Sequence, residues 1–414
     1  MSRQEILIHP FDNGLTLIVE PMTSVQSAAF SLLVPAGSIF DQPRHNGSAA
    51  LLTELIVRGA GPLTNEQLSA ALDDLGVQRH EHAGTVHVSF TGATLAANLP
   101  RALDLYGDIL RRPMLPPEQF EPARSGVRQS LEAVEDEPRQ KVMIELRRRC
   151  YDAPWGLPSD GSLEDLPNLS IDSVRDHYER CFRPNGTILG IAGNVDFREI
   201  RDVVGRVFGD WPARSDPTFA TGPRAPSPDH IPHESEQTHI GVAYEAVPFR
   251  HPDYYAAWAA VSVLSGGMSS RLFTEVRERR GLCYSVYAAL RSLKDEARVL
   301  CYAGTTNERA QQTLDVTLAE LVRLGDSIAE DELARSKAMA KSSLIMQQES
   351  TSSRSSSIAG DWYHLRRVRT LDEIRQKIDS LTVENVLAYV HEHPARDFTI
   401  VTIGPEALKM PTMG

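Results

Sequence analysis

The chain has 414 residues, which is more than one hydrophobic core usually organises, so two or more domains are expected. Hydrophobic residues make up 41% of the sequence and charged residues 24%, the balance of a soluble globular protein. The formal net charge of −12 argues against a nucleic-acid partner, because nucleic-acid phosphates attract a basic surface. The same charge is compatible with attraction of basic peptides.

The cysteines and the apolar segments indicate the cellular compartment in which the protein is expected. No Cys-x-x-Cys pair occurs, so buried thiols in a reducing compartment are expected. The cysteines are Cys150, Cys181, Cys283 and Cys301. The first residues lack the apolar core of a signal peptide, and no run of ~18 apolar residues predicts a membrane span. We therefore expect a cytoplasmic protein, or a periplasmic one if a leader preceded this sequence.

The first half of the chain mixes strand patterns with runs of helical patterns. Thr64 followed by Gln67 has the spacing of a capping box and predicts the start of a helix. Strands are predicted at 15–20, 28–34, 77–90 (one or two) and 186–193; helices are predicted at 47–57, 64–76, 98–111, 117–135, 138–150, 171–180 and 197–208. This order indicates an α+β fold, with helices packed on one face of a mainly antiparallel sheet.

A proline-rich segment at 212–235 divides the chain into nearly equal halves. Proline-rich segments are extended, semi-rigid spacers, so a linker is predicted there. The expected domains are therefore 1–211 and 236–414. A second low-complexity segment, the serine-rich stretch 347–357, is expected to cap or join helices, with a flexible loop as the alternative.

The second half repeats patterns of the first. Residues 170–178 (SIDSVRDHY) resemble residues 382–390 (TVENVLAYV), and each is followed by an apolar strand pattern, at 186–193 and 398–404. Both halves also open with strands, followed by paired helices and alternating strands. We interpret this as a tandem duplication that produced two homologous α+β domains.

The segment 264–286 (LSGGMSSRLFTEVRERRGLCYSV) predicts a rigid corner between a helix and a strand. Ser269 or Ser270 is placed to cap a helix whose last turn contains Arg277, and Gly281 is placed to end it. The alternating residues that follow, including Tyr284, predict a strand. A guanidinium and a phenol held on such a corner could stabilise an oxyanion. The spacing alone is also compatible with an exposed arginine cluster beside a core tyrosine.

The same segment resembles the second-domain signature of the M16 zinc peptidases, in the words SRLF, VRE and GLCYSV. This family includes insulin-degrading, pitrilysin-like and mitochondrial-processing-peptidase-like proteins. In the family an arginine and a tyrosine seven residues apart bind the scissile carbonyl of the substrate, and here they fall on Arg277 and Tyr284. The resemblance covers almost the whole chain and also implies two homologous domains.

Active members of the family carry the frame Gly-x-Ala-His-x-x-Glu-His-x-x-x-Lys-Gly on an early helix. Two histidines four residues apart share a helix face and bind Zn²⁺, and the glutamate acts as the general base. In residues 47–59 this chain has Ala50 and Glu54 in place of the two histidines, and Thr53 in place of the glutamate. Alanine cannot bind a metal, and threonine cannot act as the base.

The family's third zinc ligand is a glutamate on a later helix, upstream of an Asp-x-Pro. Asp136-Glu137-Pro138 places that position at Ser130, and the position of a supporting acid is Ala123. The resemblance therefore implies that this chain has no M16 zinc centre of its own. Zinc is expected in a partner chain. The strand pair His80 and His82 offers a His-x-His alternative, although solvent-facing histidines are common on strands.

These features favour a non-catalytic subunit of a two-chain M16 zinc peptidase, inactive alone. An M16 paralogue with an intact His-x-x-Glu-His motif would be its partner, and a peptide or unfolded polypeptide would be the substrate. The first alternative is an M16-like assembly or peptide-binding protein without a proteolytic role. The second alternative is a stand-alone hydrolase that uses a metal at His80 and His82.

Overall fold

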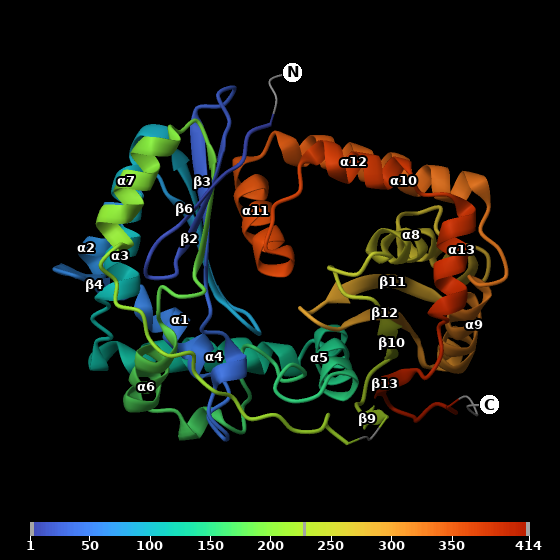
Figure 1. Cartoon of the computed structure of the whole chain (residues 1–414). Coiled ribbons are helices and arrows are strands. Elements are labelled where there is room, and N and C mark those ends of the chain that lie inside the picture. Colours follow the sequence, from blue (N-terminus) through green and yellow to red (C-terminus); the bar gives the residue numbers. More distant parts are fainter. Residues whose placement is uncertain (1–3, 227–228, 411–414) are drawn as a thin grey trace. The chain divides into compact units, whose positions relative to one another are not determined.

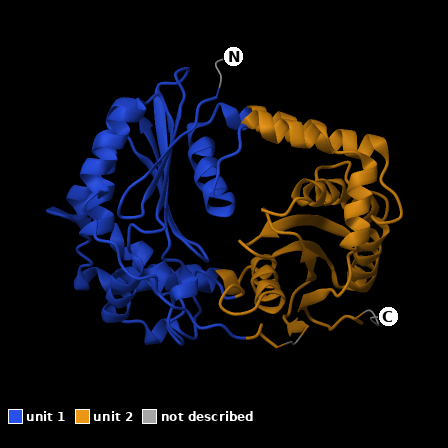
Figure 2. Ribbon diagram, viewed as in Figure 1, with its two compact units in different colours: residues 1–133, 157–222, 346–370 blue, residues 134–156, 223–345, 371–414 orange. Residues whose placement is uncertain are grey.

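The computed structural model describes residues 4–226 and 229–410. The chain forms two compact units, and each unit is assembled from three separate segments (Figure 2). Unit 1 contains residues 1–133, 157–222 and 346–370, and unit 2 contains residues 134–156, 223–345 and 371–414. The compact units therefore interleave along the sequence. The predicted domains 1–211 and 236–414 are contiguous segments that describe the duplication, and their bounds stay a prediction.

Unit 1 is built on a six-stranded sheet with the order β1-β2-β8-β3-β7-β6. Its strands are β1 (Leu7–Pro10), β2 (Thr16–Pro21), β3 (Ser27–Val34), β6 (Gln78–Ala83), β7 (Val88–Leu95) and β8 (Ile188–Gly193). All neighbours pair antiparallel except β2 and β8, which are parallel. A separate short hairpin pairs β4 (Gly59–Ala60) with β5 (Leu63–Thr64).

The helices of unit 1 lie on both faces of this sheet and not on one face as predicted, because a helix from the second half of the chain covers the second face. In Figure 1, α3 and α7 cover one face and α11 covers the other. The helices are α1 (Ser48–Ile56), α2 (Asn65–Asp74), α3 (Leu99–Arg111), α4 (Phe120–Glu135), α6 (Ile171–Cys181), α7 (Phe197–Phe208) and α11 (Thr351–Leu365), with short 3-10 turns η1 (Ser38–Phe40), η2 (Ala96–Asn98), η3 (Pro117–Gln119) and η4 (Leu166–Asn168). The predicted capping box at Thr64 and Gln67 opens α2, which confirms that helix start.

Unit 2 is built on a five-stranded sheet with the order β11-β12-β10-β13-β9. Its strands are β9 (His230–Pro232), β10 (Gln237–Ala246), β11 (Cys283–Ser292), β12 (Ala297–Thr306) and β13 (Thr399–Gly404). Its helices are α5 (Pro138–Cys150), α8 (Tyr254–Ser265), η5 (Phe273–Glu278), η6 (Asn307–Arg309), α9 (Ala310–Arg323), α10 (Glu330–Gln348, the last residues of which belong to unit 1), α12 (Leu371–Asp379) and α13 (Val383–Glu392). Alternate residues of β10 enter opposite cores: Ile240 and Val242 pack with α8, α9 and α13, and Ala243 packs with α5.

The two sheets have the same topology, which confirms the predicted α+β duplication. The order β2-β8-β3-β7-β6 of unit 1 corresponds strand by strand to β9-β13-β10-β12-β11 of unit 2. In each sheet the one parallel pair is formed by the strands that correspond, β2 with β8 and β9 with β13. Capping boxes open both α6, at Ser170, and α13, at Thr382. The repeated sequence patterns therefore encode equivalent elements.

One helix from each half packs on the sheet of the other half. Helix α11 comes from the second half and contacts β8, β3, β2 and β7, and helix α5 comes from the first half and contacts β10, β13 and β12. The approach of α11 is so close that a Cβ at Gly190 would lie 2.4 Å from the carbonyl oxygen of Ser355. Only glycine fits at that point of β8.

Two predicted low-complexity segments contain regular structure. The serine-rich stretch joins and caps helices, as expected: α10 ends at Gln348, and the Ser350 hydroxyl accepts the Ser353 amide at the start of α11. The predicted linker 212–235 is mostly irregular but includes β9, which pairs parallel with β13; its residues 227–228 lie outside the described part. All the cysteines are buried and free, as expected. Within the described residues no helix is long and apolar enough to cross a membrane.

Candidate functional site

The predicted corner of unit 2 is present, but its helix is π-helical. After α8 the chain turns at Gly266 and Gly267 and enters η5. The Arg279 amide donates to the Thr274 carbonyl at 2.9 Å, five residues back, which is the wider hydrogen bond of a π-helix. Ser270 donates its hydroxyl to the Gly267 carbonyl at 2.6 Å, and no side chain caps η5, so the predicted cap at Ser269 or Ser270 is not formed. Short π-helical turns occur frequently at functional sites.

The chain then reverses through a tight turn into β11. Gly281 has φ +59°, a conformation that favours glycine, and its amide donates to the Arg277 carbonyl at 3.0 Å. Cys283 pairs with Thr305 and Ser285 with Gly304, so Tyr284 is the extra residue of a β-bulge. A bulge re-aims the side chain that it carries, and the Tyr284 side chain is 68% exposed.

Arg277 differs from the other arginines of this corner. Arg279 and Arg280 both form ion pairs with Glu275. Arg277 is exposed, and its guanidinium lies over the Phe273 ring, 4.8 Å from the centroid, without an ion pair to any residue in the described part of the chain. Its donors are therefore free to bind a ligand while the stacking on Phe273 orients them.

The neighbouring thiol is not a candidate nucleophile. Cys283 is buried, and burial raises the pKa of its thiol to about 11, although the Arg277 guanidinium lowers it in part. A thiol with such a pKa is protonated near neutral pH and reacts poorly. The chemistry of the corner therefore depends on hydrogen-bond donors, Arg277 and Tyr284.

The positions of the M16 zinc centre fall on α1 and α4 of unit 1. Thr53 is buried and donates its hydroxyl to the Ala49 carbonyl at 2.8 Å, so it is a helix-packing residue. Glu54 faces solvent, with 56% of its side chain exposed, and forms a loose ion pair with Arg58 at 3.9 Å. Ala50 offers no donor atom, and Ser130 is exposed on α4, where it donates to the Gly126 carbonyl. These side chains do not fit the donor set that Zn²⁺ requires.

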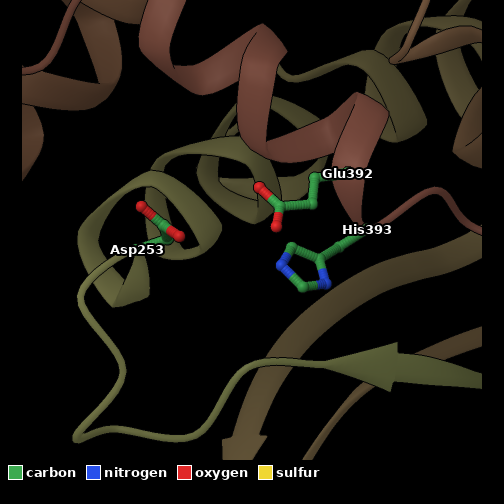
Figure 3. Close-up of side chains that lie close together, drawn as sticks. All are labelled: Asp253, Glu392 and His393. Carbon is green, nitrogen blue, oxygen red and sulfur yellow. The ribbon is translucent and has the colours of Figure 1, made fainter.

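The alternative pair on β6 is also a weak metal site. His80 and His82 are exposed with stacked rings, 6.2 Å between centroids and 11° between planes. No third donor joins them: among the described residues one group of three His, Cys, Asp or Glu ligand atoms lies within 4.8 Å, and it consists of Asp253, Glu392 and His393 in unit 2. Figure 3 shows the two carboxylates around the His393 ring. Asp253 is far in sequence from the adjacent residues Glu392 and His393, so no local spacing predicted this group.

A second feature that the sequence did not reveal is a buried pair that holds the start of α1. The Asp41 carboxylate accepts the amides of Gly47 and Ala49, at 2.8 and 3.0 Å. Its other neighbour is the fully buried His177, whose Nδ1 lies 3.3 Å from Asp41 Oδ1 and whose Nε2 bonds to the Ala36 carbonyl. Burial raises the pKa of Asp41 to about 7 and lowers the pKa of His177 to about 4.

We expect the variants Asp41→Asn and His177→Gln to depend on pH in opposite directions. The stability contributed by Asp41 is complete below its ordinary pKa of 3.8 and is lost as the pH rises toward 7. The contribution of His177 is complete above 6.5 and is lost as the pH falls toward 4, so the two nearly cancel in the wild type. On acidification Asp41→Asn should lose stability and His177→Gln should gain it, each by at least ~1 kcal/mol relative to the wild type. Urea unfolding across this pH range measures the slopes; parallel curves for all three proteins would contradict the assignment.

Comparison with known proteins places the chain in a family. Residues 17–154 match the family model described as Insulinase (Peptidase family M16), and residues 168–340 match the model described as Peptidase M16 inactive domain. The chain belongs to peptidase family M16. The inactive-domain match begins just before α6 in the first half of the chain and ends within α10.

Curated relatives cover nearly the whole chain. The uncharacterized zinc protease YmxG of Bacillus subtilis is 28% identical over 398 residues, 95% of this chain and 97% of that protein. An uncharacterized zinc protease of Streptomyces coelicolor is 26% identical over 405 residues, 95% of this chain and 88% of that protein.

Solved structures share the fold over the same extent. A peptidase M16 inactive domain from Pseudomonas fluorescens matches with a TM-score of 0.87 at 20% identity, covering 98% of this chain and 99% of that chain. A chain of Complex III2 from Candida albicans matches with a TM-score of 0.82 at 21% identity, covering 97% of this chain and 96% of that chain. At these identities the likeness shows the fold alone.

Proposed function

We propose that this chain is the non-catalytic subunit of a two-chain M16 peptidase. The observation that carries the proposal is the pair of exposed donors in unit 2, Arg277 without an ion pair and Tyr284 on a bulge, in a chain whose M16 metal positions have no suitable ligands. An M16 paralogue with an intact His-x-x-Glu-His motif supplies the zinc, which activates water for peptide hydrolysis.

In this proposal Arg277 and Tyr284 donate hydrogen bonds to the carbonyl oxygen of the scissile peptide bond. The rigid corner fixes both donors before negative charge develops on that oxygen, which is the requirement for electrostatic stabilisation of the intermediate. The substrate binds as an added strand at a sheet edge. Strand β11, which contains Tyr284, is an edge strand of its sheet, which supports this mode of binding.

A second candidate is an assembly or peptide-binding protein without proteolytic activity. The fold likeness to a chain of Complex III2 supports it, because that chain belongs to a multi-subunit assembly. An assembly role alone gives no reason for Arg277 to remain free of an ion pair beside an exposed tyrosine. The first candidate accounts for that arrangement.

We expect the purified chain alone to show no chelator-sensitive hydrolysis of peptides, because Ala50, Thr53 and Ser130 cannot form the zinc centre. Co-expression with a paralogue that carries the intact motif should give a complex whose peptidase activity exceeds that of the paralogue alone. Gel filtration and cleavage of quenched fluorescent peptides measure both results. Chelator-sensitive activity in the isolated chain, or no gain in the complex, would overturn the proposal.

A further inference from the structure

A group of potential metal ligands joins the start of one helix of unit 2 to the end of another. Asp253 immediately precedes α8, Glu392 is the last residue of α13, and His393 follows it. One ligand atom from each side chain lies within 4.8 Å of the others. In Figure 3 the carboxyl groups of Asp253 and Glu392 lie around the imidazole of His393. Helices α8 and α13 also pack against each other in the main core of unit 2.

The carboxylates of this group form no ion pair with an arginine or lysine among the described residues. Glu392 lies at the C-terminus of α13, where the helix dipole disfavours an anion, and it forms no ion pair with any described residue. Asp253 lies 3.6 Å from His251 Nδ1, but that nitrogen accepts the Asp253 amide hydrogen and therefore has no proton of its own. In the described part of the chain the two carboxylates thus meet without an arginine or lysine partner, which favours a bound cation.

His393 adds an imidazole nitrogen to the two carboxylates. Its Nε2 is shielded from solvent and has no hydrogen-bond partner among the described residues, which is costly for a buried polar atom. The ring is held in place by Tyr389 and His251, with centroid distances of 5.0 and 5.9 Å. An oriented imidazole with an unsatisfied nitrogen is suited to metal binding.

A cavity gives access to the group from one side. Glu392 and His393 line a cavity of about 510 Å³ within unit 2, together with Arg298 and the end of β10. Water or a small ligand in this space could complete the coordination of an ion held by three protein ligands. The group therefore has the features of an open metal site.

We propose that Asp253, Glu392 and His393 bind one divalent transition-metal ion such as Zn²⁺. Imidazole and carboxylate ligands suit these ions, which they bind at ~2.0–2.2 Å. The ion would tie the start of α8 to the end of α13. This site is separate from the M16 zinc positions on α1 and α4, and it departs from the expectation that the chain holds no metal.

The test uses the full chain, stripped of metal by a chelator and titrated with ZnCl₂ in a calorimeter. The wild type should bind about one Zn²⁺ per chain, and its unfolding temperature should rise. Losing a residue that only orients a ligand costs ~10–100-fold in metal affinity, so Glu392→Gln and His393→Gln should each cost at least that much.

Two matched variants serve as controls. Glu384→Gln removes the same charge from the exposed first turn of α13, and Glu54→Gln removes the one carboxylate of the degenerate motif; neither should change zinc binding. Circular dichroism establishes that each variant is folded. Absence of zinc binding, equal binding by the Glu392 and His393 variants, or loss of zinc in Glu54→Gln would overturn the proposal. None of these measurements requires peptidase activity, so the result is independent of the proposed function.

Discussion

Replacing Arg277 by alanine, in a complex with a zinc-bearing M16 partner, should lower kcat by ~10²–10³, or about 3–4 kcal/mol of transition-state stabilisation. Tyr284→Phe should have an effect of the same size. The hydrogen bonds of both residues strengthen as negative charge develops on the substrate carbonyl, so substrate affinity should change less than kcat. Steady-state kinetics of the reconstituted complex, with gel filtration to show intact assembly, measure the two effects separately.

The other arginines of the corner provide the control. Arg279→Ala removes an exposed ion pair with Glu275, which is worth less than ~1 kcal/mol, and should leave kcat nearly unchanged. Arg277→Lys should recover only part of the activity, because a point charge does not reproduce a planar guanidinium stacked on Phe273. Equal losses at positions 277 and 279 would attribute the effect to helix charge. Full activity of Arg277→Ala and Tyr284→Phe would leave this chain with an assembly role.

The local features of the site could be predicted from sequence because they depend on neighbouring residues. Gly281 indicated the end of the helix, and the alternation after it indicated β11, so Arg277 and Tyr284 were placed on one corner. The π-helical form of η5 and the bulge at Tyr284 could not be predicted. Both features depend on which backbone groups pair, for example the Arg279 amide with the Thr274 carbonyl. The same residue pattern is compatible with an α-helix or a π-helix, and with a regular strand or a bulge.

The fold class could be predicted because the duplication repeats the same patterns of hydrophobic residues in both halves. The exchange of α5 and α11 between the sheets could not, because helical periodicity shows that a helix has an apolar face but not which sheet covers it. For a similar reason the contact of Asp41 with His177 and the group formed by Asp253 and His393 could not be predicted. Each joins residues that are distant in sequence, and only the tertiary fold brings them together.

A buried ion pair joins helix α11 to strand β2, and its loss should strongly destabilise unit 1. Arg354 is 1% exposed, Glu20 of β2 is 5% exposed, and two guanidinium nitrogens donate to Glu20 Oε2 at 3.0 and 2.8 Å. Arg354→Met should lower the free energy of unfolding by ~3–5 kcal/mol, because it leaves the Glu20 carboxylate buried without its cation. Urea unfolding measures the loss, and amide hydrogen exchange should show reduced protection in α11 but not in α5.

Replacing Glu20 as well distinguishes an electrostatic cause of the lost stability from a loss of packing. In the double variant Arg354→Met with Glu20→Leu no buried charge is left, so most of the stability should return. Arg335→Met breaks a pair with Asp331 in which both side chains are exposed on α10, and it should cost less than ~1 kcal/mol. If the double variant were as unstable as Arg354→Met, the shape of the arginine side chain would be what holds α11 on the sheet. If Arg354→Met were no more harmful than Arg335→Met, the buried pair would not hold α11 at all.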